Sequence, residues 1–527
     1  MPRRRTIGVV RGGMVASSFA IPLCLAILAL AARAAASEHE RRFLFFTGSL
    51  AAVDPDAPAA PPRLVIQGAT SHRAGIRHGT LDPTTGMLSD VHLRTVVLQA
   101  GGRLHAVRAI PEDGAPVAVQ LSSEDLEPPA VICESPAVQV VADYADPDDS
   151  WYLYTVSAPD GSCGADVVRK AVRVGMSADD APVVVEGLGL ARVLRDPATG
   201  AISGWLARSG AEVVALDPDF GSPATIAALP SAESRFEVIH HVSGDRMLAR
   251  VDGALHLLDL ERGLAPEVLH TYAEPTAPSE RSRADAAHLF FLDGPTIYRI
   301  PLDGSAPAAP LVSVTRPEDS FSDFALTDEA LVYVLRAEQD GDPSLLFSLG
   351  ALPKGGAPAV TQLTGGKPDV PLLEATAGSR VFFNWLGSEV SAAAVDDDGT
   401  GLVERAGTLW VGVAYSPDHP LGSRPAPPHR LVLAEKPAAG ASGFGGGRLI
   451  AYAPTGAPVA VLGAVPSDID ALAFSGYGTR FLGSGFDHDD LSSGTSRADV
   501  FFVDTEREGS LVRVTDGPGQ KLPVHPE

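Results

Sequence analysis

Oxygen-bearing side chains alternate along one short segment, in a pattern that suits a hard cation. Asp396, Asp398 and Thr400 occupy every second position, Gly401 follows, and Glu404 comes three residues later. Calcium prefers such oxygen-rich loops, and a glycine permits the tight bend that they need. Threonine stands where these loops usually carry Asp or Asn, and the twelfth position lacks the glutamate of an EF-hand. The sequence predicts a calcium site here, with a plain acidic turn as the alternative.

Patterns that would carry catalysis are missing from the sequence. A serine hydrolase exposes its nucleophile in a G-x-S-x-G turn, and the chain offers only the superficial echo Gly483-Ser484-Gly485. Zinc sites place histidines at ligand spacing, as in H-E-x-x-H, whereas the 14 histidines here are scattered. The sequence therefore predicts no catalytic residue. An enzyme would have to assemble Asp, His and Arg side chains from distant segments.

Two cysteines, Cys133 and Cys163, lie beyond the N-terminal segment. In an oxidising compartment their simplest product is one disulfide, which closes a loop of about 30 residues. Two free, buried thiols are the alternative.

The N-terminus has the features of an export signal. Three arginines at residues 3–5 precede an apolar run at 14–32, and three alanines at 34–36 offer an A-x-A cleavage site. We expect residues 1–36 to be a signal peptide, and the rest to be periplasmic, cell-surface or secreted, with no membrane span after cleavage. Because the apolar run is long enough to span a bilayer, an uncleaved anchor is one alternative, and lipidation at the cysteine of this segment is another.

Charge excludes one class of partner. The 527 residues include 41 Lys and Arg against 65 Asp and Glu, for a net charge of −24. Such an acidic surface repels phosphate backbones, so no nucleic acid is expected as a partner. Basic peptides or divalent cations match this charge better, and a role in solubility alone is the other interpretation.

The elements that carry these residues belong to a repeated unit of short strands and Asp-Gly turns. Residues 288–315 contain three such strands, and four are legible at 235–271, at 321–364 and in the last copy. Long helical patterns are missing after the N-terminal segment. Units of this kind predict an all-β chain whose residues 37–527 form a ring of four-stranded antiparallel sheets, a β-propeller.

The number of units exceeds that of a usual propeller. Nine are clear, and a tenth, weaker one begins at residues 43–49 and 63–69. Single propellers usually hold four to eight blades. Either one or two units are irregular insertions, or the chain forms more than one sheet system. We expect a single ring of seven or eight blades, with the N-terminal strand completing the last blade.

The repeated pattern LFFLDG…IYRIPLDG…LVSVT, seen again as DVFFVDT…GSLVRVTDGPG, resembles TolB-like propellers and the propeller domain of prolyl oligopeptidases and dipeptidyl peptidases. The resemblance covers most of residues 37–527. It implies a propeller that binds proteins or peptides in its central channel or on one face. It implies no catalytic residue, because a hydrolase domain is absent.

These features predict an exported, non-catalytic β-propeller that binds a protein, peptide or glycan partner in the cell envelope or outside the cell. The long loops at residues 124–150 and 416–428 are the candidate contact surfaces. Aromatic residues in second strands, such as Phe382, Phe383 and Trp385, are expected to pack between blades. The alternatives are a hydrolase or lyase with its site at the channel mouth, and a purely structural surface protein.

Overall fold

The computed structural model describes residues 44–523, with gaps at 48, 68, 82–87, 101–102, 110–117, 121–138, 146–150, 158–169, 176–182, 186–187, 196–201, 218–222, 244, 274–281, 340–341, 356–359, 388, 416–427, 439–440, 442, 478, 487–497 and 517–520. For most of residues 63–202 the description is limited to the backbone of the strands. The described residues are all-β, as the sequence predicts. They include no apolar helix of membrane-spanning length.

The first half of the chain contributes the strands β1 (Leu44–Phe46), β2 (Ser49–Ala52), β3 (Arg63–Gln67), β4 (Ala69–Leu81), β5 (Leu88–Ala100), β6 (Arg103–Ala109), β7 (Ala118–Gln120), β8 (Gln139–Ala145), β9 (Trp151–Ser157), β10 (Lys170–Gly175), β11 (Val183–Val185), β12 (Leu188–Arg195), β13 (Ile202–Ser209), β14 (Glu212–Leu216), β15 (Ala224–Ala228), β16 (Phe236–Ser243), β17 (Arg246–Val251), β18 (Ala254–Asp259), β19 (Gly263–Leu264) and β20 (His270–Thr271).

The second half contributes the strands β21 (Ser282–Ala284), β22 (His288–Asp293), β23 (Thr296–Pro301), β24 (Ala309–Ser313), β25 (Ser320–Leu326), β26 (Ala330–Gln339), β27 (Asp342–Pro353), β28 (Thr361–Gln362), β29 (Val370–Ala377), β30 (Arg380–Leu386), β31 (Ser391–Asp396), β32 (Val403–Ala406), β33 (Thr408–Tyr415), β34 (Pro428–Glu435), β35 (Arg448–Tyr452), β36 (Pro458–Ala464), β37 (Ala471–Tyr477), β38 (Arg480–Phe486), β39 (Ala498–Asp504), β40 (Val512–Arg513) and β41 (Leu522–Pro523).

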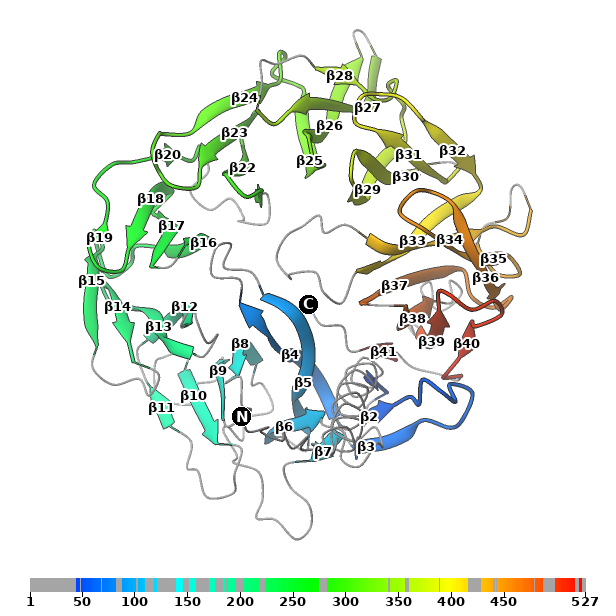
Figure 1. The fold of residues 1–527 in the computed structure, drawn as a ribbon, viewed down its shortest axis with the longest axis horizontal. Helices are drawn as coiled ribbons and strands as arrows, with labels where there is room; N and C mark the ends of the chain where they lie inside the picture. Colours follow the sequence, from blue (N-terminus) through cyan, green and yellow to red (C-terminus); the bar gives the residue numbers. More distant parts are fainter. Residues whose placement is uncertain are drawn as a thin grey trace, which may run out of the picture.

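These strands form nine sheets in the described part of the chain, and the sheets follow one another around a ring (Figure 1). Seven sheets have four strands, one has five, and one has eight. Strands such as β16, β25 and β29 lie on the inner side of the ring, and the last strands of the same sheets lie on its outer side (Figure 1). This arrangement fits a propeller. The expected number of seven or eight blades is not confirmed.

Tight turns join successive strands where the sequence has Asp-Gly pairs. Between β17 and β18, Val251 pairs with Ala254, so that only Asp252 and Gly253 form the turn. Both have positive φ, 47° and 85°, as the two central residues of a type I′ hairpin require. Asp and Gly tolerate that conformation best, which explains why this dipeptide marks the ends of strands in the sequence.

Second strands are buried on both faces, and β30 illustrates this. Successive residues of a strand point to opposite faces. Phe383 and Trp385 pack in one cluster with side chains of β26 and β27, whereas Phe382 packs in another with Trp410 and Leu431 of the following sheet. The prediction that these aromatic residues pack between blades is therefore confirmed.

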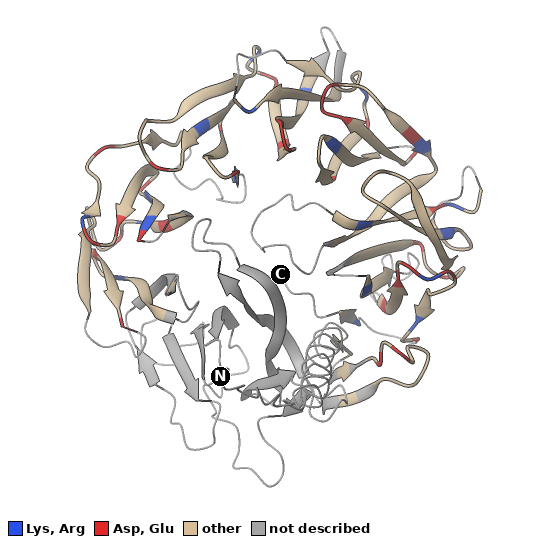
Figure 2. Cartoon of the chain, in the orientation of Figure 1, with Lys and Arg blue, Asp and Glu red and all other residues tan. Residues whose placement is uncertain are grey.

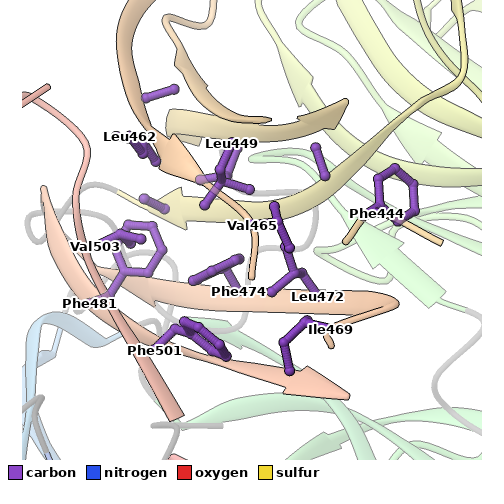
Figure 3. Packing of buried hydrophobic residues seen from close by; sticks show 14 of the residues in the cluster. Phe444, Leu449, Leu462, Val465, Ile469, Leu472, Phe474, Phe481, Phe501 and Val503 are labelled. Carbon is purple, nitrogen blue, oxygen red and sulfur yellow. The ribbon is translucent and has the colours of Figure 1, made fainter. Parts of the chain in front are cut away.

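The eight-stranded sheet joins two four-stranded groups through their inner strands. β33 pairs with β37 in parallel, with Gly412 opposite Phe474. A Cβ atom on Gly412 would lie 2.4 Å from the Cβ atom of Phe474, so only glycine allows the two backbones to approach. Behind this pairing, a cluster that includes Phe474 and Phe501 fills the space between the two groups (Figure 3).

The first and last described strands meet in one sheet, but in the opposite sense to our expectation. The C-terminal strand β41 pairs with β1, with Phe45 opposite Pro523, and gives the first sheet the order β3-β2-β1-β41. The last four strands before it, β37–β40, already form a complete group. The first sheet would therefore have only β1, β2 and β3 without the C-terminal segment, and β41 supplies its fourth, inner strand.

A buried network of ions fixes this closure. Asp499 on β39 is fully buried, and it accepts hydrogen bonds from Arg513 on β40 and, at 2.9 Å, from Nζ of Lys521, next to β41. Burial opposes ionisation of Asp499, but the bonds from Arg513 and Lys521 outweigh it, so that the pKa is lowered. Arg513 also contacts Asp468 at 2.8 Å.

Replacing Asp499 should destabilise the protein strongly. Asp499→Ala leaves Arg513 and Lys521 without their buried partner, and such losses cost about 3–5 kcal/mol. The matched control is Arg448→Ala, because Arg448 is 64% exposed in its ion pair with Glu435, and exposed pairs contribute roughly 0–1 kcal/mol. Urea unfolding measures both changes. Similar losses in the two variants would contradict the assignment of Asp499 to the closure.

Candidate functional site

Each predicted calcium ligand already has a protein partner. The Asp398 carboxylate accepts hydrogen bonds from the hydroxyl and backbone N–H of Thr400, at 2.7 and 2.8 Å, and these bonds lower its pKa. Asp396 lies 3.4 Å from Nη1 of Arg380. Glu404 lies on β32 and forms an ion pair with Nζ of Lys367 at 2.7 Å. A calcium ion would therefore compete with Arg380 and Lys367.

The described residues hold no group of three or more His, Cys, Asp and Glu side chains suited to a metal ion. Calcium binding at the four predicted residues stays a prediction, which a direct measurement can decide.

Several other predicted features lie wholly or partly outside the described residues. Cys133, Cys163 and the signal peptide at residues 1–36 are among them. Of the two candidate contact loops, most of 416–428 is also outside. Within 124–150 the chain forms the strand β8, so that part was wrongly expected to be a loop.

The echo of a hydrolase motif proves to be a packing feature. Ser484 lies within β38 and is buried. Cβ atoms on Gly483 and Gly485 would lie 2.1 and 2.4 Å from ring atoms of Phe474 and Phe501. The two glycines thus make room for these rings, and the serine is not presented on a strand-to-helix turn.

One face of the β29–β30 hairpin combines exposed apolar side chains with polar ones. Val370 pairs with Leu386, and Leu372 pairs with Asn384, so these four side chains share a face of the sheet. Val370, Leu372 and Leu386 are 44%, 47% and 38% exposed. We call this surface, together with Glu374, the β29 face. Its β29 residues lie on an inner strand of the ring (Figure 1), and Asn384 and Leu386 lie on the adjacent strand β30.

Asn384 ties the β29 face to the next sheet. Its Nδ2 donates to the carbonyl oxygen of Trp410 at 2.9 Å, and its Oδ1 accepts from the Trp410 N–H at 2.8 Å. The second Nδ2 proton goes to Oε1 of Glu374 at 2.7 Å. Because every hydrogen of this buried amide has an acceptor, the residue joins β30 to β33 at little desolvation cost.

Glu374 is a partly buried acid with a single hydrogen-bonding partner. β29 carries a bulge between Leu373 and Ala375, and bulges redirect side chains. Burial raises the pKa of Glu374 to about 7, against a smaller opposing effect of the Asn384 hydrogen bond. No described residue donates to Oε2, and this oxygen is not among the buried atoms that lack a partner. Oε2 is therefore not completely buried.

Sequence reasoning missed this site, although a signal was present. Glu374 stands inside the apolar run VPLLEATA, and Asn384 stands between Phe383 and Trp385. A polar residue inside a strand that is otherwise buried must find a partner. Screening the predicted strands for such residues would have found both.

A second polar cluster holds two sheets together elsewhere. Asp293 accepts a hydrogen bond from the Ala273 N–H and lies 2.8 Å from Nε2 of His270. The His270 ring packs against Phe291 and Tyr298, with centroid distances of 4.8 and 4.5 Å. These contacts connect β20 to β22. No serine, cysteine or exposed acid accompanies the pair among the contacts described for it, so we interpret it as structural.

No protein family model matches the chain, and no curated protein matches it either. Among solved structures, a chain described as a eukaryotic initiation factor is 13% identical, with a TM-score of 0.39; the match covers 61% of this chain and 74% of that one. Prolyl oligopeptidase B from Galerina marginata is 11% identical, with a TM-score of 0.34, and 69% and 55% of the two chains are covered.

Oligopeptidase B from Leishmania major gives the same identity and TM-score, with 69% and 54% covered. The chain thus spans little more than half the length of either oligopeptidase. At such TM-scores these likenesses establish neither the fold nor the activity of this chain. The TolB-like part of the resemblance stays a prediction.

Calcium binding can be measured by thermal unfolding. A ligand that binds only the folded state stabilises it, by about 2.7 kcal/mol at a hundredfold excess over Kd. If the loop binds calcium, the Tm rises in calcium relative to chelator, and Asp398→Ala abolishes the rise. Asp303→Ala is the control, because Asp303 caps a similar Asp-Gly turn through the Ser305 N–H. No rise in the wild type, or an equal effect of both variants, would overturn the calcium prediction.

Glu374→Gln should stabilise the protein more at high pH than at low pH. The folded-state pKa of about 7 exceeds the ordinary value of 4.5, so the folded chain holds its proton longer than the unfolded chain. The contribution of Glu374 to the free energy of unfolding therefore falls as the pH rises from 4.5 to 7, and is constant above it. Glutamine removes this dependence and should gain about 2 kcal/mol more at pH 8 than at pH 5.5.

Urea unfolding at the two pH values measures this gain. The exposed Glu318→Gln removes the same charge and is the control. An equal gain at both pH values would contradict the raised pKa.

Proposed function

We propose that the protein is an exported, non-catalytic β-propeller that binds a protein, peptide or glycan partner in the cell envelope or outside the cell. In this proposal, residues 1–36 are the signal peptide that directs export. The observation that carries this proposal is the β29 face. Single exposed apolar residues are common on protein surfaces, but Val370, Leu372 and Leu386 share one face of one hairpin. Contiguous exposed apolar side chains are typical of interaction sites.

The rigidity of this surface also supports binding. Asn384 fixes β30 to β33. Phe382 is fully buried against the following sheet, and Phe383 and Trp385 are fully buried against the preceding one. A surface held in place before binding loses little conformational entropy when the partner arrives. The partner would therefore meet a preformed face.

The hydrolase or lyase alternative has less support. Acid–base catalysis uses pairs of titratable groups whose pKa values are pushed apart within one site. In the described residues Glu374 bonds to an amide, and the His270–Asp293 pair connects β20 to β22 instead. Ser484 is buried.

The distribution of charge supports the exclusion of nucleic acids. Lys and Arg side chains lie on several sheets around the described part of the ring, interspersed with Asp and Glu (Figure 2). With a net charge of −24, the protein offers little attraction for a phosphate backbone.

Screening the purified protein with a synthetic library of acetylated heptapeptides and with a glycan array tests the proposal. We expect ligands whose affinity, measured by fluorescence anisotropy, falls at least tenfold in Leu372→Lys. Val461→Lys is the control, because Val461 is 40% exposed on the outer strand β36. Absence of any ligand, or equal losses in the two variants, would overturn binding at the β29 face.

A further inference from the structure

We propose that the β29 face binds a peptide segment in which a Lys or Arg side chain stands next to an apolar side chain, and that Glu374 is the carboxylate that receives the cation. This inference rests on the proposed function and names the chemistry of the partner. The apolar neighbour would contact Leu372 and Val370.

Geometry places the carboxylate and the apolar side chains together. Leu372 is the strand partner of Asn384, and Glu374 accepts a hydrogen bond from the side chain of the same Asn384. Leu372 and Glu374 therefore both lie next to the side-chain amide of Asn384. Oε1 of Glu374 accepts the hydrogen bond from that amide, and Oε2, which is not completely buried, has no donor among the described residues. A donor from the partner would complete the coordination of this carboxylate.

The described strands that pack against β29 form no ion pair with Glu374. β25, β27, β30, β33 and β34 pack against β29, and β33 has no charged residue. The charged or titratable side chains on the other four are Asp323 on β25, Asp342 on β27, Arg380 on β30, and His429, Arg430 and Glu435 on β34.

Both arginines in this set are engaged elsewhere. Arg380 lies 3.4 Å from Asp396, and Arg430 lies 2.9 Å from Glu506. At the other end of the hairpin, the carboxyl group of Asp369 packs against the backbone of Gly387. An acid thus lies at each end of the exposed apolar run, and a basic partner has the complementary charge.

The chemistry of the β29 face favours a peptide over a metal ion or a glycan. A divalent metal needs several oxygen ligands, and Glu374 supplies one accessible oxygen. A glycan needs several polar partners for its hydroxyl groups, whereas the exposed neighbours are apolar. A guanidinium or ammonium group on an aliphatic stem matches one carboxylate beside apolar side chains.

Such binding is linked to pH. A bound cation favours the ionised form of Glu374, so a partner that binds below pH 7 must displace the proton that burial retains there. Affinity should therefore increase about tenfold from pH 6 to pH 8. Any contribution of His429 on β34 to the dependence on pH would persist when Glu374 is replaced.

The test uses the heptapeptide library at pH 8, followed by synthetic pairs in which the basic residue is replaced by norleucine or citrulline. We expect enrichment of Lys or Arg beside an apolar residue, and at least a tenfold loss of affinity in the neutral peptides. Glu374→Gln should cause a similar loss and abolish the dependence on pH, whereas Glu318→Gln should change neither. Thermal unfolding confirms that each variant is folded.

The outcomes separate this inference from the proposed function. Peptides that require Leu372 but bind equally well without their cation, or equally to Glu374→Gln, would overturn the role of Glu374 and leave binding at the β29 face intact. If no heptapeptide binds, or if binding does not require Leu372, the inference fails. A glycan that requires Leu372 would preserve the proposed function alone.

Discussion

The structure depends on the requirement that each second strand bury both of its faces against neighbouring sheets. In β30, Phe383 and Trp385 fill the space toward the preceding sheet, while Phe382 fills the space toward the following one. No sheet can cover these faces alone. Consecutive sheets must therefore pack side by side, and a ring is the arrangement in which every sheet has two neighbours.

The same requirement governs the polar residues of the second strands. A strand buried on both faces can accept a polar side chain only if that group is fully paired. Asn384 meets this condition by bonding the backbone of Trp410 and the carboxyl group of Glu374. The packing of the sheets therefore determines the position of Glu374, and the β29 face is a direct consequence of that packing.

Local patterns in the sequence predicted the strands well. Alternating apolar residues and Asp-Gly turns identified β16 to β18, β22 to β28 and β37 to β40, because both signals act within a few residues. Contacts between distant segments were harder to predict. The parallel pairing of β33 with β37 requires Gly412 to approach Phe474, and nothing in the sequence around either residue marks the other.

The closure of the ring was predicted in the wrong sense for the same reason. β1 and β41 are too short, at three and two residues, to reveal which sheet lacks a strand. The candidate site was missed because Glu374 and Asn384 belong to no known motif. Their importance follows from hydrogen bonds and burial, which depend on how the strands are arranged in space.

The position of β41 has a consequence for the growing polypeptide. β1 to β3 are among the first strands to be synthesised, yet their inner partner includes Leu522 and Pro523, near the end of the chain. Until β41 has been synthesised, the edge of β1 lacks this hydrogen-bonding partner. An unpaired edge can recruit strands from other chains. The newly made protein is therefore open to such pairing, or to capture by a chaperone, until Leu522 and Pro523 pair with β1.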